Sequence, residues 1–381
     1  MIIFELLFWG SFGILVYVFF GSIVILSLIA RFRHKPVQKR DWTPSVSVII
    51  CAFNEAKHIR HKLLDCDAFD YPKDRLEIIV VSDGSTDDTD KILERLKSDR
   101  IRIFRMPEQM GKTECQNFAT TNARNDILFF TDATVLHPPE ALRLLMRSLS
   151  DPSVGCVTGK PIFKQDTGAI SRGLSKREKY EFYLRSKLAM VGTLFGAQDC
   201  IYAIPRTLYC PVRADLDSGF VGPLQLLDKG YRTVYEPEAL AFVDRRAPNL
   251  TDEFVRRSRI ALRGMRGLIY MRQLMNPIKH GFVAVSLIST RLLRWLTPIF
   301  LILLLVSNLF LLGNYFYWFA FASQAAFYAT ALIAFVIARR KSRLIFPLYV
   351  PLYFCVMACS ALIGLIKLTA GETGQIWSTR R

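Results

Sequence analysis

One stretch of the 381-residue chain decides its fold class: Ser45-Val-Ser-Val-Ile-Ile-Cys51, which is followed by Ala-Phe-Asn-Glu. A short β-branched run bounded by polar residues predicts a buried strand, and the helical pattern after it extends to about Cys66. Further apolar runs alternate with helical stretches along the next hundred residues; they lie at 76–81, 101–104, 127–130 and 154–158. Strands that alternate with helices predict an α/β fold with a largely parallel sheet and helices on both faces.

Three of the predicted strands end in acidic or amide side chains, namely Asn54-Glu55, Asp83 and Asp132. In open α/β sheets the ligand lies beyond the carboxyl ends of the strands. Carboxylates gathered there repel one another unless a cation or a hydrogen-bonding ligand joins them. A nucleotide with Mg²⁺ or Mn²⁺ supplies both, since these ions prefer oxygen ligands. Each acid alone is typical of a loop or a helix cap, but three at successive strand ends favour a nucleotide site.

Gly111-Lys112 resembles the end of a phosphate-binding P-loop. The residue five positions before Gly111 is Met106 rather than the glycine that this motif requires, which excludes a P-loop ATPase. Lys112 is still predicted at a helix N-terminus, where backbone amides favour a phosphate group. The alternative is a solvated lysine after a turn.

Long uncharged segments flank this region. Leu6 to Ala30 has 25 residues without a charge, enough to cross a bilayer, and the basic residues that follow it argue against a cleaved signal peptide. A second uncharged segment, 297–338, is twice the length of one span, with a hairpin expected at Gly313-Asn314, and a third lies at 344–366. Lys and Arg residues next to the spans predict a multi-pass protein of the cell membrane with residues 41–276 in the cytoplasm.

The predicted organisation therefore has five parts. An N-terminal transmembrane helix at 1–30 precedes a cytosolic domain at 41–276, an interfacial amphipathic helix at 277–296, three transmembrane helices within 297–368, and a tail at 369–381. An extended start to the next span is the alternative for 277–296. The chain has 50 Lys and Arg against 33 Asp and Glu, and much of this excess flanks the spans. Membrane lipids are thus the expected partner of these charges, and no nucleic-acid partner is predicted.

Six motifs in this order resemble the membrane-bound family-2 glycosyltransferases, which are inverting enzymes of GT-A fold and include the cellulose, chitin, hyaluronan and poly-N-acetylglucosamine synthases. The motifs are Cys51-Ala-Phe-Asn-Glu55, Val81-Ser-Asp-Gly-Ser-Thr-Asp87, Gly111-Lys112 with Asn117, Phe130-Thr-Asp-Ala133, Gly196 through Arg206, and Gly230 through Ala239. The resemblance covers about Pro44 to Arg263. It implies a Rossmann-like, mostly parallel sheet with flanking transmembrane helices.

The resemblance implies roles for individual residues. Glu55 and Asp83 would hold the base and ribose of a nucleotide-sugar donor, with Lys112 near the donor. Asp132 matches the first acid of the family's Asp-x-Asp motif and would bind Mg²⁺ or Mn²⁺, but Thr134 stands at the third position. Metal binding would then be either weaker or completed by donor phosphates and water, as Mg²⁺ often prefers. His137 is considered as an extra ligand, against the alternative of a solvated loop histidine.

The general base of the family is an Asp in an acidic pair before the Gly-Tyr-Arg strand. This chain reads Asp215-Leu-Asp217-Ser-Gly-Phe-Val, and alignment on Phe220-Val221 places the paired acids at Ser218 and Gly219. Asp217 is therefore expected to be the base, with Asp215 in reserve. Such a base takes the proton of the acceptor hydroxyl as the anomeric carbon is attacked, so an α-linked donor would give a β-linkage.

Processive synthases carry Gln-x-x-Arg-Trp after this region, whereas this chain has Arg256-Arg-Ser-Arg259-Ile260. Arg256 and Arg259 are expected near the donor diphosphate, because guanidinium groups match phosphate oxygens. The alternative is a basic helix on anionic headgroups. Without the Trp, an aromatic surface for the acceptor sugar is missing at that position. Transfer of a single sugar is therefore nearly as well supported as polymerisation.

The leading hypothesis is a membrane-embedded transferase that moves a sugar from a nucleotide sugar to a glycan or lipid-linked acceptor. A UDP-sugar is the favoured donor. The alternative is a non-catalytic, membrane-anchored nucleotide-binding scaffold subunit of a polysaccharide-synthesis complex. The altered metal motif and the displaced base favour that alternative. A transporter is disfavoured, since the predicted spans carry no charges apart from Lys367.

Overall fold

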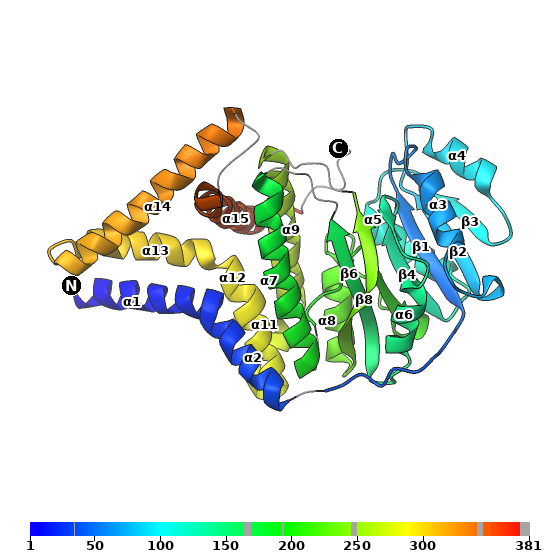
Figure 1. The fold of residues 1–381 in the computed structure, drawn as a ribbon, viewed down its shortest axis with the longest axis horizontal. Helices are drawn as coiled ribbons and strands as arrows, with labels where there is room; N and C mark the ends of the chain where they lie inside the picture. Colours follow the sequence, from blue (N-terminus) through cyan, green and yellow to red (C-terminus); the bar gives the residue numbers. More distant parts are fainter. Residues whose placement is uncertain (34, 164–168, 193, 245–249, 341–345, 374–381) are drawn as a thin grey trace. The chain divides into compact units, whose positions relative to one another are not determined.

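The computed structural model describes residues 1–33, 35–163, 169–192, 194–244, 250–340 and 346–373 (Figure 1). The chain divides into two compact units. A helical unit contains residues 1–32, 165–184 and 246–373, and a sheet unit contains 33–164, 185–245 and 374–381. Residues 169–184 and 250–276, expected within the cytosolic domain at 41–276, thus group with the helical unit.

The sheet unit is built on a mixed sheet that has eight strands within the described residues, in the order β3-β2-β1-β4-β7-β6-β8-β5. Strands β3 to β4 in this order are parallel, whereas β7 runs antiparallel to both β4 and β6, and β5 antiparallel to β8. The bounds are β1 (Val46–Ala52), β2 (Leu76–Ser82), β3 (Ile101–Arg105), β4 (Ile127–Asp132), β5 (Val135–Leu136), β6 (Val154–Phe163), β7 (Tyr202–Pro205) and β8 (Arg232–Val243). The predicted α/β class with a mostly parallel sheet is confirmed.

Helices cover both faces of this sheet because successive side chains of a strand point to opposite faces. In β1, Val48 and Ile50 pack into one apolar cluster, and Ile49 and Cys51 pack into another. The first cluster includes residues of α3 (Ile59–Asp67) and α6 (Ala141–Leu149), and the second includes residues of α5 (Lys112–Asn122) and α8 (Ser218–Asp228). Another helix, α4 (Thr89–Leu96), adds Leu93 to the first cluster. The carboxyl ends of β1, β2 and β4 therefore meet at one edge between two helical layers.

The helical unit holds the segments expected to cross the membrane. In the described residues, three helical stretches are long and apolar enough to do so: Ile2–Phe32, Tyr315–Ala338 and Pro347–Thr369. They correspond to α1 (Ile2–Val16) with α2 (Ser22–Phe32), to α14 (Tyr315–Arg340) and to α15 (Phe346–Thr369). The same unit contains α9 (Leu250–Tyr270), and α7 (Ala169–Val191) begins in it and ends in the sheet unit.

The third expected C-terminal span has a different geometry. Helix α13 (Thr297–Leu309) has 13 residues, fewer than the roughly 20 that a span requires. It follows the stretch Phe282–Trp295 with a bend of 62°, so the two together make one broken span or a re-entrant segment. That stretch holds α11 (Phe282–Leu287) and α12 (Leu293–Trp295), after the short α10 (Pro277–His280), where one interfacial helix was expected.

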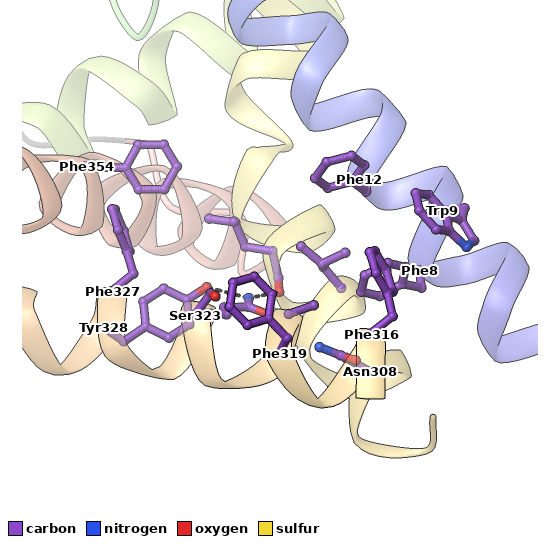
Figure 2. Close-up of a pocket in the computed structure, with 14 residues that line it drawn as sticks. Phe8, Trp9, Phe12, Asn308, Phe316, Phe319, Ser323, Phe327, Tyr328 and Phe354 are labelled. Carbon is purple, nitrogen blue, oxygen red and sulfur yellow. Dashed lines mark hydrogen bonds between the residues drawn. The ribbon is translucent and has the colours of Figure 1, made fainter. Parts of the chain in front are cut away.

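An apolar cavity of about 540 Å³ lies among α1, α13, α14 and α15 (Figure 2). Aromatic side chains dominate its lining, among them Phe8, Phe319 and Phe327, and the ring of Trp9 stacks on Phe316 at a centroid distance of 5.5 Å. Such a lining offers few hydrogen-bond donors for a phosphate group. A nucleotide site is therefore to be sought at the polar edge of the sheet.

Candidate active site

The loops that follow β1 and β2 are tied together by Asn54. Its backbone adopts a positive φ of 55°, which asparagine tolerates better than most residues. Its side-chain oxygen accepts hydrogen bonds from the backbone N–H groups of Thr86 at 2.8 Å and Asp87 at 3.3 Å. The next residue, Glu55, donates its backbone N–H to Thr89 at 2.8 Å and keeps a nearly buried side chain 3.7 Å from the His58 ring. Glu55 is thus fixed at the edge of the sheet.

Asp83 holds the loop that leads into α5. Its fully buried carboxylate accepts hydrogen bonds from the backbone N–H groups of Met110 at 2.7 Å and Gly111 at 3.0 Å. Gly111 has a φ of +93°, a conformation that favours glycine. The observed contacts of Asp83 therefore position the N-terminus of α5, and a contact with ribose or base stays a prediction.

Lys112 is the first residue of α5 and lies at the centre of the acids. Its Nζ donates to Oδ1 of Asp132, the last residue of β4, at 2.6 Å. Burial lowers the pKa of Lys112, but the carboxylates of Asp132 and Asp199 outweigh burial and raise it above its usual value. The lysine is therefore protonated at neutral pH and is paired with Asp132.

Asp199 belongs to this cluster although the sequence analysis did not single it out. It lies in a tight turn before β7, between Gln198 and Ile201, which form an antiparallel bridge. A signal was present, since Asp199 is the acidic residue within the motif Gly196 through Arg206. The role of Asp199 depends on which helix packs against its turn, and this contact is between segments far apart in the sequence.

Asp217 is brought to the same region by contacts between α5 and the segment before α8. Thr113 donates its hydroxyl to the carbonyl of Leu216 at 2.9 Å, and Asn117 donates its amide to the carbonyl of Val212 at 2.8 Å. Asp217 caps α8, because its Oδ1 accepts the N–H of Phe220 at 3.1 Å.

Asp215, the reserve candidate for the base, has its carboxylate engaged. Both of its oxygens accept hydrogen bonds from the guanidinium of Arg213, each at 3.0 Å. A bidentate pair of this kind stabilises the carboxylate in one orientation. Asp217 is therefore the better placed of the two candidates predicted from the sequence.

Comparison with known proteins identifies this architecture. Residues 47–204 match the family model described as glycosyl transferase family 2. The chain contains a family 2 glycosyltransferase domain. This match confirms the resemblance drawn from the six motifs, and together with relatives named as glycosyltransferases it supports an enzyme of this class.

The curated relatives include two kinds of named glycosyltransferase. A poly-beta-1,6-N-acetyl-D-glucosamine synthase of Staphylococcus aureus is 26% identical over 224 residues, which are 55% of this chain and 52% of the relative. Glycosyltransferase AglE of Haloferax volcanii is 27% identical over 164 residues, 42% of this chain and 54% of the relative. The chain thus spans about half the length of these relatives.

One solved structure resembles nearly the whole chain. It is the mannosyltransferase PcManGT from Pyrobaculum calidifontis in complex with GDP-Man and Mn²⁺, with a TM-score of 0.70 and 20% sequence identity. The similarity covers 96% of this chain and 99% of that one. At this identity the likeness establishes the fold, a Rossmann-like sheet of the GT-A type.

Arg256 and Arg259 lie on α9, in the helical unit, so their grouping with the acids of the family 2 domain stays a prediction. Arg256 is paired with the buried carboxylate of Glu253 at 2.7 Å, and Arg257 contacts the same carboxylate at 2.7 Å. Burial raises the pKa of Glu253, but Arg257 and Arg256 outweigh it and lower that pKa to about 2. Arg256 and Arg257 thus share a structural partner, Glu253, on their own helix.

His137 is a buried residue of the family 2 domain and not a solvated loop histidine. Its Nδ1 lies 3.0 Å from Nζ of Lys62, and its Nε2 lies 3.3 Å from the carbonyl oxygen of Cys200. Burial lowers the pKa of His137 to about 4; the charge of Lys62 acts in the same direction and that of Asp65 against it. These contacts engage both ring nitrogens within the protein, which leaves no free imidazole nitrogen for a metal.

Few side chains of this protein are available to bind a metal ion at the site. Among the described residues, no group of three His, Cys, Asp or Glu side chains is placed to hold a metal ion. Asp132 offers one carboxylate, whose Oδ1 is paired with Lys112, and Thr134 is a poor ligand for a divalent cation. Mg²⁺ commonly binds one or two carboxylates together with substrate phosphates and water. The residues therefore fit a metal that arrives with, and is largely held by, a donor diphosphate.

Proposed function

We propose that this protein is a membrane-bound inverting glycosyltransferase that transfers a sugar from a nucleotide sugar to a glycan or lipid-linked acceptor. The donor that we favour is a UDP-sugar. The observation that carries the proposal is the cationic Lys112 Nζ, 2.6 Å from Asp132 and influenced by Asp199, at the carboxyl edge of the parallel strands. Transfer from an α-linked donor would form a β-linkage. The named relatives support this reaction class.

The donor would bind along the edge from β2 to β4. Glu55 and Asp83 would face the base and ribose, and the ammonium of Lys112, at the N-terminus of α5, would meet the diphosphate. The positive end of the helix dipole favours the same group. The further prediction from the sequence is that Arg256 and Arg259 add positive charge to the diphosphate.

Asp132 would be the protein ligand of Mg²⁺ or Mn²⁺, with phosphate oxygens and water completing the shell. When bound, such an ion neutralises charge that develops on the departing diphosphate. The ammonium of Lys112 is also positive and is paired with the same carboxylate, that of Asp132. Lys112 and the metal ion would therefore both stabilise the departing diphosphate.

The acceptor hydroxyl would lose its proton to a carboxylate near the start of α8. Asp217 is the candidate predicted from the sequence, with Asp215 in reserve. Because both oxygens of Asp215 are paired with Arg213, Asp217 is favoured of these two. Inversion requires that the base act on the face of the sugar opposite the leaving group.

The protein would reside in the cell membrane as a multi-pass protein with the sheet unit in the cytoplasm, where nucleotide sugars are made. In the part of the chain that the structure describes, three helical stretches are long and apolar enough to cross a bilayer. These stretches, and the basic residues after the first of them, support this orientation. Membrane lipids are then partners of the helical unit.

The deciding experiment is nucleotide release by the detergent-purified full chain with Mg²⁺ or Mn²⁺ across a panel of nucleotide sugars and acceptor lipids. Release from one donor, abolished by chelator and reduced in Asp132→Ala, is expected. Thr134→Ala, two residues along the same loop, is the matched control and should retain release. Nucleotide binding without release from any donor would instead support the scaffold function, which the altered Asp-x-Asp motif favours.

A further inference from the structure

Gly219 stands where alignment on Phe220-Val221 places an acid of the family's pair, so this position has no side chain. The space beside Gly219 is nevertheless filled. A Cβ added to Gly219 would overlap Oδ1 of Asp199 and lie 2.9 Å from its Cγ, with Oδ1 of Asp217 at 3.5 Å. The carboxylate of Asp199 thus occupies the volume into which a side chain at position 219 would extend.

Backbone contacts fix the turn that delivers this carboxylate. The N–H of Ala197 donates to the carbonyl of Gly219 at 2.7 Å, and the N–H of Gln198 donates to the hydroxyl of Thr158 at 2.8 Å. Gly196 has a φ of +127°, which lets the chain turn against the start of α8. The carboxylate and the empty position therefore face each other across a hydrogen-bonded junction.

We propose that Asp199 is the general base of the transfer, a carboxylate supplied by the turn before β7 in place of one supplied by α8 at position 219. This inference rests on the proposed function. The acceptor O–H proton passes to an oxygen of Asp199 while the acceptor oxygen bonds to the anomeric carbon. The bond from that carbon to the diphosphate oxygen breaks, and its electron pair leaves with the diphosphate.

Two observations favour Asp199 over Asp217. Asp217 already accepts the N–H of Phe220 as the cap of α8, so its orientation serves the helix. The carboxylate of Asp199 instead fills the volume beside Gly219, where the family's acid would extend, and it caps none of the helices that the structure describes.

The test uses the full chain and compares Asp199→Asn with Asp217→Asn. Both are isosteric, and both are assayed for kcat of sugar transfer and for affinity for the nucleoside diphosphate. Asp199→Asn is expected to lower kcat at least 100-fold, the usual scale for removal of a general base, with nucleotide affinity within threefold. Gly222→Ala, where an added Cβ meets nothing within 4 Å, is the silent control.

A relocation variant separates a chemical role from a structural one. Asp199→Gly alone should be inactive, and Asp199→Gly combined with Gly219→Asp should regain at least a tenth of the wild-type kcat. Retained activity in Asp199→Asn overturns the inference. So does loss of nucleotide binding in Asp199→Asn without rescue by the double variant. If the wild type releases no nucleotide from any donor, the proposed function itself fails, which is a different result.

Discussion

Acid should destabilise the sheet unit through His137. The imidazole is packed against Lys62, whose side chain is fully buried and whose Nζ also donates to the carbonyl of Val135 at 2.7 Å. Protonation of His137 would place a second cation beside that ammonium, with Asp65 as the neighbouring acid at 3.3 Å. Burial of the ring, and then the charge of Lys62, favour the neutral form in the native state and lower the pKa of His137 from 6.5 to about 4.

The sign and size of the effect follow from this shift. The unfolded chain binds a proton at His137 below pH 6.5, whereas the native chain does so only below about pH 4, so stability falls as the pH drops between these values. Linkage gives a loss of about 2 kcal/mol in the free energy of unfolding between pH 7.5 and pH 5. Above pH 6.5 the contribution is complete, and below pH 4 it changes no further.

The assay is denaturant unfolding of the detergent-purified chain at several pH values, followed by intrinsic fluorescence, for the wild type and His137→Gln. The variant lowers stability at every pH, because it disturbs the contacts with Lys62 and the Cys200 carbonyl. Between pH 7.5 and pH 5, however, the free energy of unfolding of the variant should fall by about 2 kcal/mol less than that of the wild type. Equal pH dependence in the two proteins would refute a buried neutral imidazole at this position.

Three further perturbations have defined outcomes. Lys112→Gln should weaken binding of a nucleoside diphosphate at least tenfold in a calorimetric titration, since it removes the cation paired with Asp132; unchanged affinity would contradict its place at the diphosphate. Gly159→Ala should cost about 2 kcal/mol of unfolding free energy, because its Cβ would press on the backbone of β8, whereas Gly222→Ala should be neutral. Asn117→Ala should reduce kcat more than nucleotide affinity, because it releases the segment before α8, while Thr121→Ala, exposed on the same helix, should leave both unchanged.

Much of the sheet was predictable because its signals are local. Strands β1, β2, β3 and β4 coincide with short apolar runs, and the acids at their ends follow directly in the chain. The antiparallel direction of β7 was not predictable in this way, since it depends on pairing across more than 70 residues, as between Phe130 and Tyr202. The same holds for the division into units, because α9 (Leu250–Tyr270) is a polar, amphipathic helix that packs against α15 in the helical unit.

The residues of the candidate site could be predicted from the sequence only in part. Glu55, Asp83, Lys112 and Asp132 could be proposed from motifs because each motif keeps one residue type at one place in the chain. A general base, however, is defined by its position in space relative to the acceptor hydroxyl, and any neighbouring segment can supply it. Reading along the chain reveals an acid missing at position 219, and only the fold reveals an acid filling that space from position 199.

This relation bears on the choice between enzyme and scaffold. The glycine at 219, taken alone, favours a chain that has lost catalysis, as does Thr134 in the metal motif. The half-buried carboxylate of Asp199, however, occupies the volume into which an acid at position 219 would extend. The chain thus keeps an acid at the place where the family's base is expected, although another segment supplies it. The pair Gly219 and Asp199 therefore supports a relocated base in a working transferase, and the relocation variant decides between the two.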